Sequence, residues 1–245
     1  MRRQTEFGEI LINRSASSMK KYQDIFIGSS NLLYFIKYET ILTLFGQMPG
    51  AAGLFLRKIF FKRLFKRVGS NVVFGRNITI RHPKKIEIGD NVIIDDNCVL
   101  DAKGNFEVGI NIGNNVLINR NTILSCKNGS IKIGDNTNIG TNCLLHSASS
   151  LRLGENILIA AYCYLIAGGS HDFKRTDIPI IQQPEIHKGG ILVENDVWLG
   201  ADVKVLDGVK IDTGTIIGAG SVVAKDIPAF SVAVGIPAKI VRSRK

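Results

Sequence analysis

The sequence predicts an all-β solenoid with three flat sides, preceded by a helical segment. Three observations lead to this prediction. An aliphatic residue recurs every six positions from Val68 onward, the repeats group into seven sets of three, and the insertions between sets all fall at one corner. Residues 68–227 form this repeating body, residues 1–67 the preceding segment, and residues 228–245 a short C-terminal tail.

Each set of three hexads predicts one inward side chain on each side of the solenoid. Stacked on its equivalent one coil away, such a side chain would lie at the ~4.8 Å spacing of neighbouring strands. A coil of about eighteen residues is far shorter than the ~33–47-residue repeats of helical arrays, which excludes that class. The predicted inward residues are Val68, Phe74, Ile80; Ile88, Ile94, Leu100; Ile112, Ile118, Leu124; Ile133, Ile139, Leu145; Leu153, Ile159, Leu165; Val193, Leu199, Val205; and Ile211, Ile217, Val223.

The insertions support the same architecture. The larger ones are residues 103–108, 127–130 and 167–190, and each follows the third hexad of its set. Insertions confined to one corner are expected of stacked coils, because per-repeat insertions map to loops on one face. The insertion at 167–190 is the longest, and a long loop on a rigid scaffold is usually functional.

The corners and the narrow interior also fit the solenoid. Asn, Asp and Gly recur between the sides, where tight corners need left-handed backbone. The four cysteines show no C-x-x-C spacing and are expected to be small apolar core residues in a reducing cytosol, without disulfides. These cysteines are Cys98, Cys126, Cys143 and Cys163.

Charge divides the chain into a basic head, a nearly neutral body and a basic tail. Residues 1–67 hold 12 Lys and Arg against 4 Asp and Glu, although the whole chain carries a net charge of +10. A nucleic-acid binder would more often carry its charge on the folded body, and no nucleic-acid recognition motif is present. We therefore expect no nucleic-acid partner.

From Val68 to Arg242 the hexads resemble those of the bacterial hexapeptide-repeat acyltransferases, in particular the maltose, galactoside and polysaccharide O-acetyltransferases. The resemblance implies a left-handed parallel β-helix of about seven coils, whereas the general rule for parallel crossovers would give right-handed ones. It also implies a homotrimer, in which each site lies between two prisms.

The long insertion carries the catalytic candidate, His171. Two glycines, Gly168 and Gly169, precede it and allow a closely approachable backbone. The resemblance assigns His171 the role of general base. An alcohol must lose its proton as it attacks a thioester, and imidazole is suited to accept that proton. Since no Ser or Cys nucleophile motif is present, direct transfer is favoured over an acyl-enzyme.

The resemblance further implies an acetyl-coenzyme A site near the end of the repeat, with acetyl-coenzyme A as donor substrate. The sole Trp follows the loop, and the closing stretches 217–228 and 234–239 match family motifs that bind the coenzyme. For Lys239 and Arg242, solvated surface charge is an open alternative. The implied residues are Trp198, Ala201, Ala219, Gly220, Lys225, Lys239 and Arg242.

Four further residues are candidates for acceptor contact: Asn142, His146, Asp172 and His187. His146 either lines the acceptor site or is a polar corner residue, and Asp172 either orients a neighbouring group or is solvated. A substrate-contacting Asn of the maltose and galactoside branch is missing here, where the sequence reads Gly140-Thr141-Asn142. A maltose or galactoside acceptor is therefore not expected. No H-x4-H pair occurs, and no metal is expected.

Residues 25–67 are apolar and basic. The uncharged run 40–56 is shorter than the ~20 residues of a membrane-spanning helix and is broken by Pro49-Gly50. Residues 54–67 alternate basic and apolar side chains at helical spacing, which predicts a basic amphipathic helix. Residues 25–67 either contact an anionic membrane peripherally or cap the open end of the solenoid, and the two roles are compatible.

These features predict a cytoplasmic acetyl-coenzyme A-dependent O-acetyltransferase, peripheral on the inner face of the cytoplasmic membrane if residues 25–67 bind lipid. The acceptor would be a sugar hydroxyl of a surface-polysaccharide or lipid-linked glycan precursor. Three alternatives stay open: N-acetylation of an amino sugar, transfer from an acyl carrier protein, and a non-catalytic scaffold.

Overall fold

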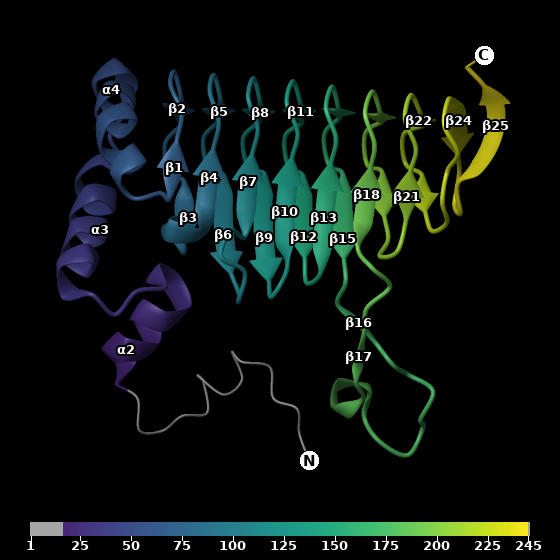
Figure 1. Cartoon of the computed structure of the whole chain (residues 1–245), viewed down its shortest axis with the longest axis horizontal. Coiled ribbons are helices and arrows are strands. Elements are labelled where there is room, and N and C mark those ends of the chain that lie inside the picture. The colour runs from purple at the N-terminus through teal and green to yellow at the C-terminus, as the bar shows by residue number, and fades with distance from the viewer. Residues whose placement is uncertain (1–16, 245) are drawn as a thin grey trace.

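The hexads fold into three parallel sheets that form the sides of a prism, with helices at its N-terminal end (Figure 1). The computed structural model describes residues 17–244. It confirms the predicted β-solenoid of about seven turns with N-terminal helices. Residues 1–16 of the predicted N-terminal segment and Lys245 of the tail lie outside the described residues. The left-handed sense of the coil stays a prediction from the resemblance.

Each side of the prism takes one strand from every coil. The first sheet contains β1 (Arg67–Val68), β4 (Ile86–Ile88), β7 (Ile110–Ile112), β10 (Ser130–Ile133), β13 (Ser150–Leu153), β18 (Ile191–Val193) and β21 (Lys210–Ile211). The second contains β2 (Val73–Phe74), β5 (Ile93–Ile94), β8 (Leu117–Ile118), β11 (Asn138–Ile139), β14 (Leu158–Ile159), β19 (Trp198–Leu199), β22 (Ile216–Ile217), β24 (Ser231–Val234) and β25 (Lys239–Ser243). The third contains β3 (Thr79–Arg81), β6 (Val99–Lys103), β9 (Ile123–Lys127), β12 (Leu144–Ser147), β15 (Tyr164–Ala167), β20 (Lys204–Val205) and β23 (Val222–Val223).

Strand register matches the predicted stacking of inward residues. Ile94 pairs with Ile118, and Leu165 pairs with Val205 across the coil that carries the long insertion. These aliphatic side chains are buried, and burying each one contributes about 1.5–3 kcal/mol. Burial also raises the pKa of the Cys98 thiol to about 11, so this cysteine is an inert core residue.

The corners are built largely by asparagines with left-handed backbone. Asn71, Asn91, Asn115 and Asn136 have φ angles of 53–55°. Their side-chain amides form a ladder, in which each Nδ2 donates to the Oδ1 of the next coil at 3.0, 3.1 and 3.0 Å. The corner residues therefore satisfy their own polar groups while they turn the chain.

The helices lie across the open edge of the first coil. They are α2 (Ser18–Tyr22), a π-helical turn (Gln23–Ile27), α3 (Leu32–Phe45), α4 (Gly50–Phe60) and a 3-10 turn (Phe61–Arg63). The α-helix predicted over residues 54–67 therefore ends at Phe60. Leu64 and Phe65 are buried, and the Phe65 ring stacks on Phe74 of the first coil, so packing against the solenoid ends the helix. No helix among residues 17–244 has the length and hydrophobicity to cross a membrane.

Polar contacts fix the helices to the solenoid. Tyr38 Oη donates to the Ile80 carbonyl at 2.6 Å, and the Asn77 amide donates to the Gly46 carbonyl at 2.9 Å. Arg57, which is 2% exposed, donates through Nε to the Phe74 carbonyl at 2.9 Å. The inner side of the helical layer thus covers the first coil and its unpaired strand groups.

The solenoid continues past residue 227. β24 extends the second sheet in parallel after β22, and β25 pairs antiparallel with β24. An antiparallel last strand closes the C-terminal end of the prism at the far end from the helices (Figure 1).

Candidate functional site

The long insertion folds into a hairpin that leaves the prism after β15, an interior strand of the third sheet. β16 (Ser170–His171) pairs antiparallel with β17 (Glu185–Ile186), and a 3-10 turn (Ile180–Gln182) lies between them (Figure 1). Gly168 and Gly169 have φ angles of 91° and 84°, which favour glycine, and they let the chain turn away from β15. The hairpin therefore gives His171 a defined position.

Two contacts hold the hairpin to the prism. Lys127 Nζ of β9 lies 3.6 Å from Glu185 Oε1. The carboxylate of Asp207, which is 7% exposed, accepts hydrogen bonds from the Lys188 and Gly190 amides at 2.8 and 2.9 Å. The sequence analysis did not identify Lys127, Glu185 or Asp207. A buried carboxylate such as that of Asp207 indicates a structural or functional role. The sequence alone does not reveal which acidic residues are buried.

His171 lies directly opposite Glu185 in the hairpin. Its Nδ1 atom is buried and has no hydrogen-bond partner among the described residues. A buried polar atom left without a partner costs about 1–3 kcal/mol. Such an atom is expected to gain a partner from water, from a ligand or from another protein chain.

His146 lies on β12, in the strand beside β15. Burial, and then the charge of Lys127, lowers the pKa of His146. The side chain is therefore neutral near pH 7 and can offer one donor and one acceptor nitrogen. Its neighbour across the strand pair is Ile166, two residues before the glycines of the loop.

The other acceptor candidates have mainly local contacts. The Asp172 amide donates to the Pro184 carbonyl at 2.8 Å, and its carboxylate accepts from the Lys174 amide at 3.0 Å. His187 is exposed on the returning arm of the loop. Asn142 has a φ angle of 57° and is a corner residue.

The coenzyme candidates lie in the last coils. The Gly220 amide donates to the Ala201 carbonyl at 2.8 Å, which stacks two corners between the second and third sheets. Trp198 is 48% exposed on the outer face of the second sheet. Lys225 is exposed beyond β23. Lys239 and Arg242 are exposed on β25.

One chain does not bring all of these residues together. His171 lies beyond the C-terminal end of strand β15 of the third sheet, whereas Trp198, Ala201 and Ala219 lie in the second sheet or at its border with the third. Different edges of the prism therefore carry the catalytic candidate and most of the coenzyme candidates.

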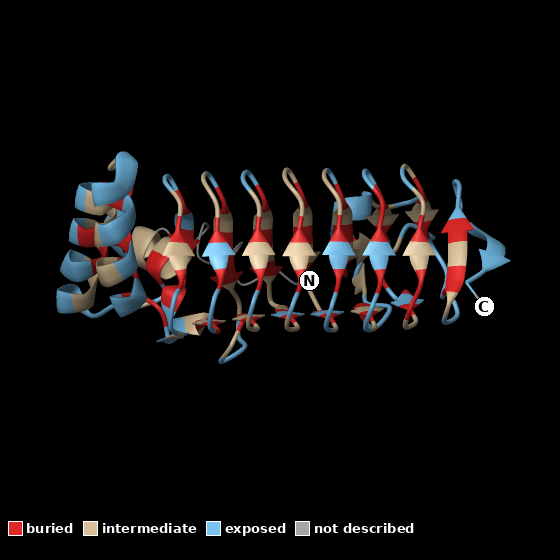
Figure 2. Cartoon of the chain, turned by 90° about the horizontal axis from the view of Figure 1, so that it is seen from above, coloured by how far each residue is buried: buried red, intermediate tan, exposed pale blue. Residues whose placement is uncertain are grey.

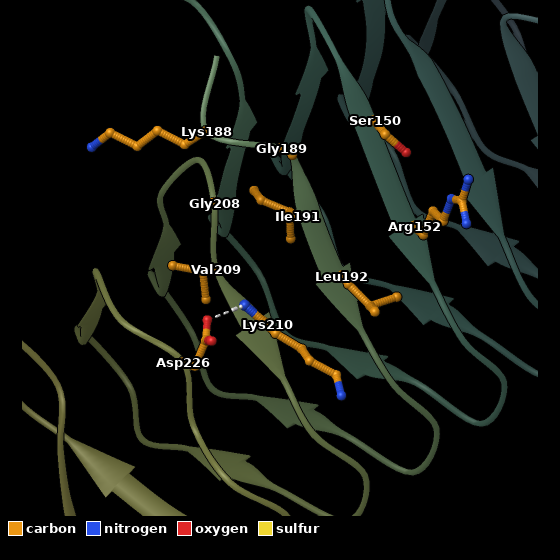
Figure 3. Close-up of a pocket in the computed structure, with 11 residues that line it drawn as sticks. Ser150, Arg152, Lys188, Gly189, Ile191, Leu192, Gly208, Val209, Lys210 and Asp226 are labelled. Atoms are coloured by element: carbon orange, nitrogen blue, oxygen red, sulfur yellow. Dashed lines mark hydrogen bonds between the residues drawn. The ribbon is translucent and has the colours of Figure 1, made fainter. Parts of the chain in front are cut away.

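A cleft of about 420 Å³ lies beside the returning arm of the loop (Figure 3). Arg152, Lys188 and Lys210 make its rim basic, and Asp226 accepts a hydrogen bond from the Lys210 amide at 2.7 Å. None of the predicted site residues lines it. Separately, residues 17–244 contain no group of three or more His, Cys, Asp or Glu side chains that could hold a metal ion.

Family models match three segments of the solenoid. The model described as bacterial transferase hexapeptide (six repeats) matches residues 190–225. The model described as hexapeptide repeat of succinyl-transferase matches residues 67–102 and 130–167.

Two curated relatives share shorter stretches. A Mycobacterium tuberculosis protein named a probable acetyltransferase is 36% identical over 92 residues, which is 37% of this chain and 30% of that protein. The 2,3,4,5-tetrahydropyridine-2,6-dicarboxylate N-acetyltransferase of Clostridium perfringens is 50% identical over 52 residues, 21% of this chain and 22% of that enzyme. The chain thus spans less than a third of each of these relatives.

Among solved structures, a variant of AntD, an N-acyltransferase from Bacillus cereus, superposes with a TM-score of 0.52 at 26% identity. The match covers 77% of this chain and 89% of that one. That structure contains dTDP-4-amino-4,6-dideoxyglucose and coenzyme A.

Proposed function

The chain belongs to the hexapeptide-repeat family of bacterial transferases, and from that premise we propose that it is an acetyltransferase that uses acetyl-coenzyme A. The proposed acceptor is a sugar hydroxyl, and the proposed general base is His171. The observation that carries the proposal is the hairpin β16–β17, which presents an imidazole with a buried, unpartnered Nδ1 beside the solenoid.

In the proposed reaction, the acceptor oxygen forms a bond to the thioester carbonyl carbon while His171 accepts the hydroxyl proton. The carbon–sulfur bond then breaks. The proton passes from His171 to the departing thiolate, which leaves as coenzyme A. The transient oxyanion needs N–H donors nearby, and exposed corner backbone is one source of them.

The donor proposal rests on the last coils. The exposed Ala219 corner offers backbone groups to a ligand, and Lys225 offers a cation to its phosphates. The similar N-acyltransferase AntD contains coenzyme A in its solved structure. These observations support coenzyme A as the carrier of the acyl group.

We further propose a homotrimer, because the outer face of the second sheet carries a largely apolar row. Ile93, Leu158 and Trp198 in this row are 44%, 45% and 48% exposed. The matching row of the first sheet is mostly polar. A neighbouring copy on the apolar row would cover it and bring a second loop close to the coenzyme candidates. The apolar row is Val73, Ile93, Leu117, Leu158, Trp198, Ile216 and Val232, interrupted by Asn138.

An amino-sugar acceptor is the second candidate, favoured by the similarity to AntD and its bound amino sugar. Reaction on nitrogen would use the same donor and the same base. The two candidates differ in the bond that is formed, which is an ester in one case and an amide in the other.

Product analysis separates them. The protein is incubated with acetyl-coenzyme A and either a hydroxyl-only glycan or a nucleotide-linked amino sugar, and products are followed by mass spectrometry before and after mild alkali. We expect an acetylated product that alkali reverses, because esters hydrolyse and amides resist. An alkali-stable product from the amino sugar alone would replace the first candidate by the second.

A further inference from the structure

The helical layer has an outer face that packs on no other described part of the chain. α3 and α4 bury their inner sides on the first coil, and exposed residues cover the side that faces away from the prism (Figure 2). On this outer face, Leu32, Leu33, Ile36 and Phe55 are 64%, 79%, 51% and 60% exposed. We call this surface, with Leu44 and Leu54, the outer helical face.

The exposed apolar side chains of α3 gather on one side of the helix. On α3, Leu32 and Ile36 are one helical turn apart, and Leu33 and Leu44 flank them on the same exposed side. The uncharged Thr40 and Thr43 fill the positions between them. A contiguous exposed apolar patch marks an interaction site more often than scattered surface side chains do.

The charged residues on and around the face are nearly all basic. Lys37, Lys58, Lys62 and Arg63 are exposed on α3, on α4 and in the turn that follows. Within the helical segment from residue 18 to residue 66 the only acidic residues are Asp24 and Glu39, and the Glu39 carboxylate accepts a hydrogen bond from Tyr22 Oη at 2.8 Å. An apolar centre with a basic rim is complementary to an anionic lipid surface.

We propose that the outer helical face docks on an anionic phospholipid bilayer. The apolar side chains enter the boundary between headgroups and acyl chains, and the Lys and Arg side chains lie among the lipid phosphates. Both helices run across the end of the prism (Figure 1). A membrane bound to their outer side would therefore lie across that end, and the long axis of the prism would point away from the membrane surface. In the proposed trimer with parallel prisms, three such faces would meet the same membrane and strengthen binding by avidity.

Docking would fix the distance of His171 from the membrane surface. The meaning of this distance for the acceptor rests on the proposed function. The hairpin joins the prism at β15, four coils beyond β3, and reaches back to Lys127 of β9. With ~4.8 Å per coil and a helical layer ~10 Å thick, His171 would lie about 20–30 Å above the lipid. An acceptor anchored in the same membrane would then be a lipid-linked glycan with several sugars between lipid and acetylated hydroxyl.

Vesicle sedimentation tests the docking proposal. The full chain is mixed with vesicles of phosphatidylcholine alone or of phosphatidylcholine with phosphatidylglycerol, and the sedimented fraction is measured at low and high salt. We expect sedimentation with the anionic vesicles only, weakened by salt.

Each basic residue near an anionic surface increases the partition coefficient between membrane and water about fivefold. The partition coefficient of the double variant Lys58→Glu/Lys62→Glu should therefore fall at least about twentyfold. Leu33→Ser/Phe55→Ser should lose sedimentation at either salt concentration.

Matched controls change the same kinds of residue elsewhere. Lys132→Glu/Lys174→Glu removes two exposed lysines from the solenoid and the loop, and Phe106→Ser/Ile181→Ser removes two exposed apolar residues. Both should sediment like the parent chain. Acetyl-coenzyme A binding is measured on every variant, so a loss of docking is distinguished from a loss of the proposed activity.

Either of two results would overturn the proposal. One is the absence of sedimentation with anionic vesicles by chain that still binds acetyl-coenzyme A. The other is self-association of the parent chain in sedimentation velocity that Leu33→Ser/Phe55→Ser abolishes, because the outer helical face would then bind a second copy.

Discussion

Replacement of His171 by alanine is expected to lower the turnover number by about 10²–10⁴-fold, the usual contribution of a positioned general base. The hairpin should persist, because Lys127–Glu185 and the Asp207 hydrogen bonds to the returning arm do not involve the imidazole. Steady-state kinetics with acetyl-coenzyme A and the acceptor identified by product analysis gives the measurement, and circular dichroism checks the fold.

His187→Ala is the matched control, since it removes the second histidine of the same loop. His187 is exposed on the returning arm, so its loss should affect KM for the acceptor more than turnover. Near-normal turnover of His171→Ala, or an equal loss in both variants, would remove His171 from the role of general base.

Replacement of Arg57 by methionine is expected to lower the free energy of unfolding by about 3 kcal/mol or more. The buried guanidinium donates to the carbonyls of Phe74, Phe45 and Met48 at 2.9, 3.2 and 2.6 Å. Methionine keeps most of the side-chain volume but leaves these three carbonyls without their donor. Guanidinium chloride unfolding followed by circular dichroism measures the difference.

Lys58→Met provides the comparison, because it removes the neighbouring positive charge from an exposed position. We expect a change within about 0.5 kcal/mol there. Equal unfolding midpoints for the two variants would show that Arg57 does not hold the helices to the first coil.

The solenoid could be predicted from the sequence because its period is local and repeated. Within each coil the inward residues recur every six positions through Val223, and equivalent residues such as Ile94 and Ile118 pair between neighbouring coils. Asparagine at most of the tight corners adds a second, independent signal. A wrong assignment at one repeat would conflict with the pattern of the other repeats, so the whole set supports the prediction.

The helical cap and the anchors of the loop depend on contacts between distant residues. In the sequence, Arg57 is one of several basic residues between positions 57 and 67 and gives no sign of burial. In the fold it is buried and donates a hydrogen bond to the Phe74 carbonyl. Glu185 pairs with Lys127 across 58 positions of sequence, and no periodicity relates them. Such pairings depend on where the insertion folds back, which the hexad spacing does not determine.

The relative positions of the candidate site residues could be predicted only in part, for the same reason. The family resemblance identifies the candidate residues individually and does not say how they are arranged in space. In the structure they lie on two different edges of the prism. Ala201 and Gly220 do meet, through a hydrogen bond of 2.8 Å, because equivalent corners of adjacent coils stack. In the proposed trimer, the arrangement of His171 relative to that corner would depend on a second copy of the chain, which the repeat pattern of one sequence does not place.

Calorimetric titration of acetyl-coenzyme A into the purified, folded protein tests the proposed function most directly. We expect saturable binding at micromolar concentration, weakened at least about tenfold in Lys225→Ala through loss of a cation at the coenzyme phosphates. Lys132→Ala, which removes an exposed lysine of the first sheet, should bind like the parent chain. Absence of binding by well-folded protein would contradict the proposal and would point to an acyl carrier protein as donor or to a solenoid without transferase activity.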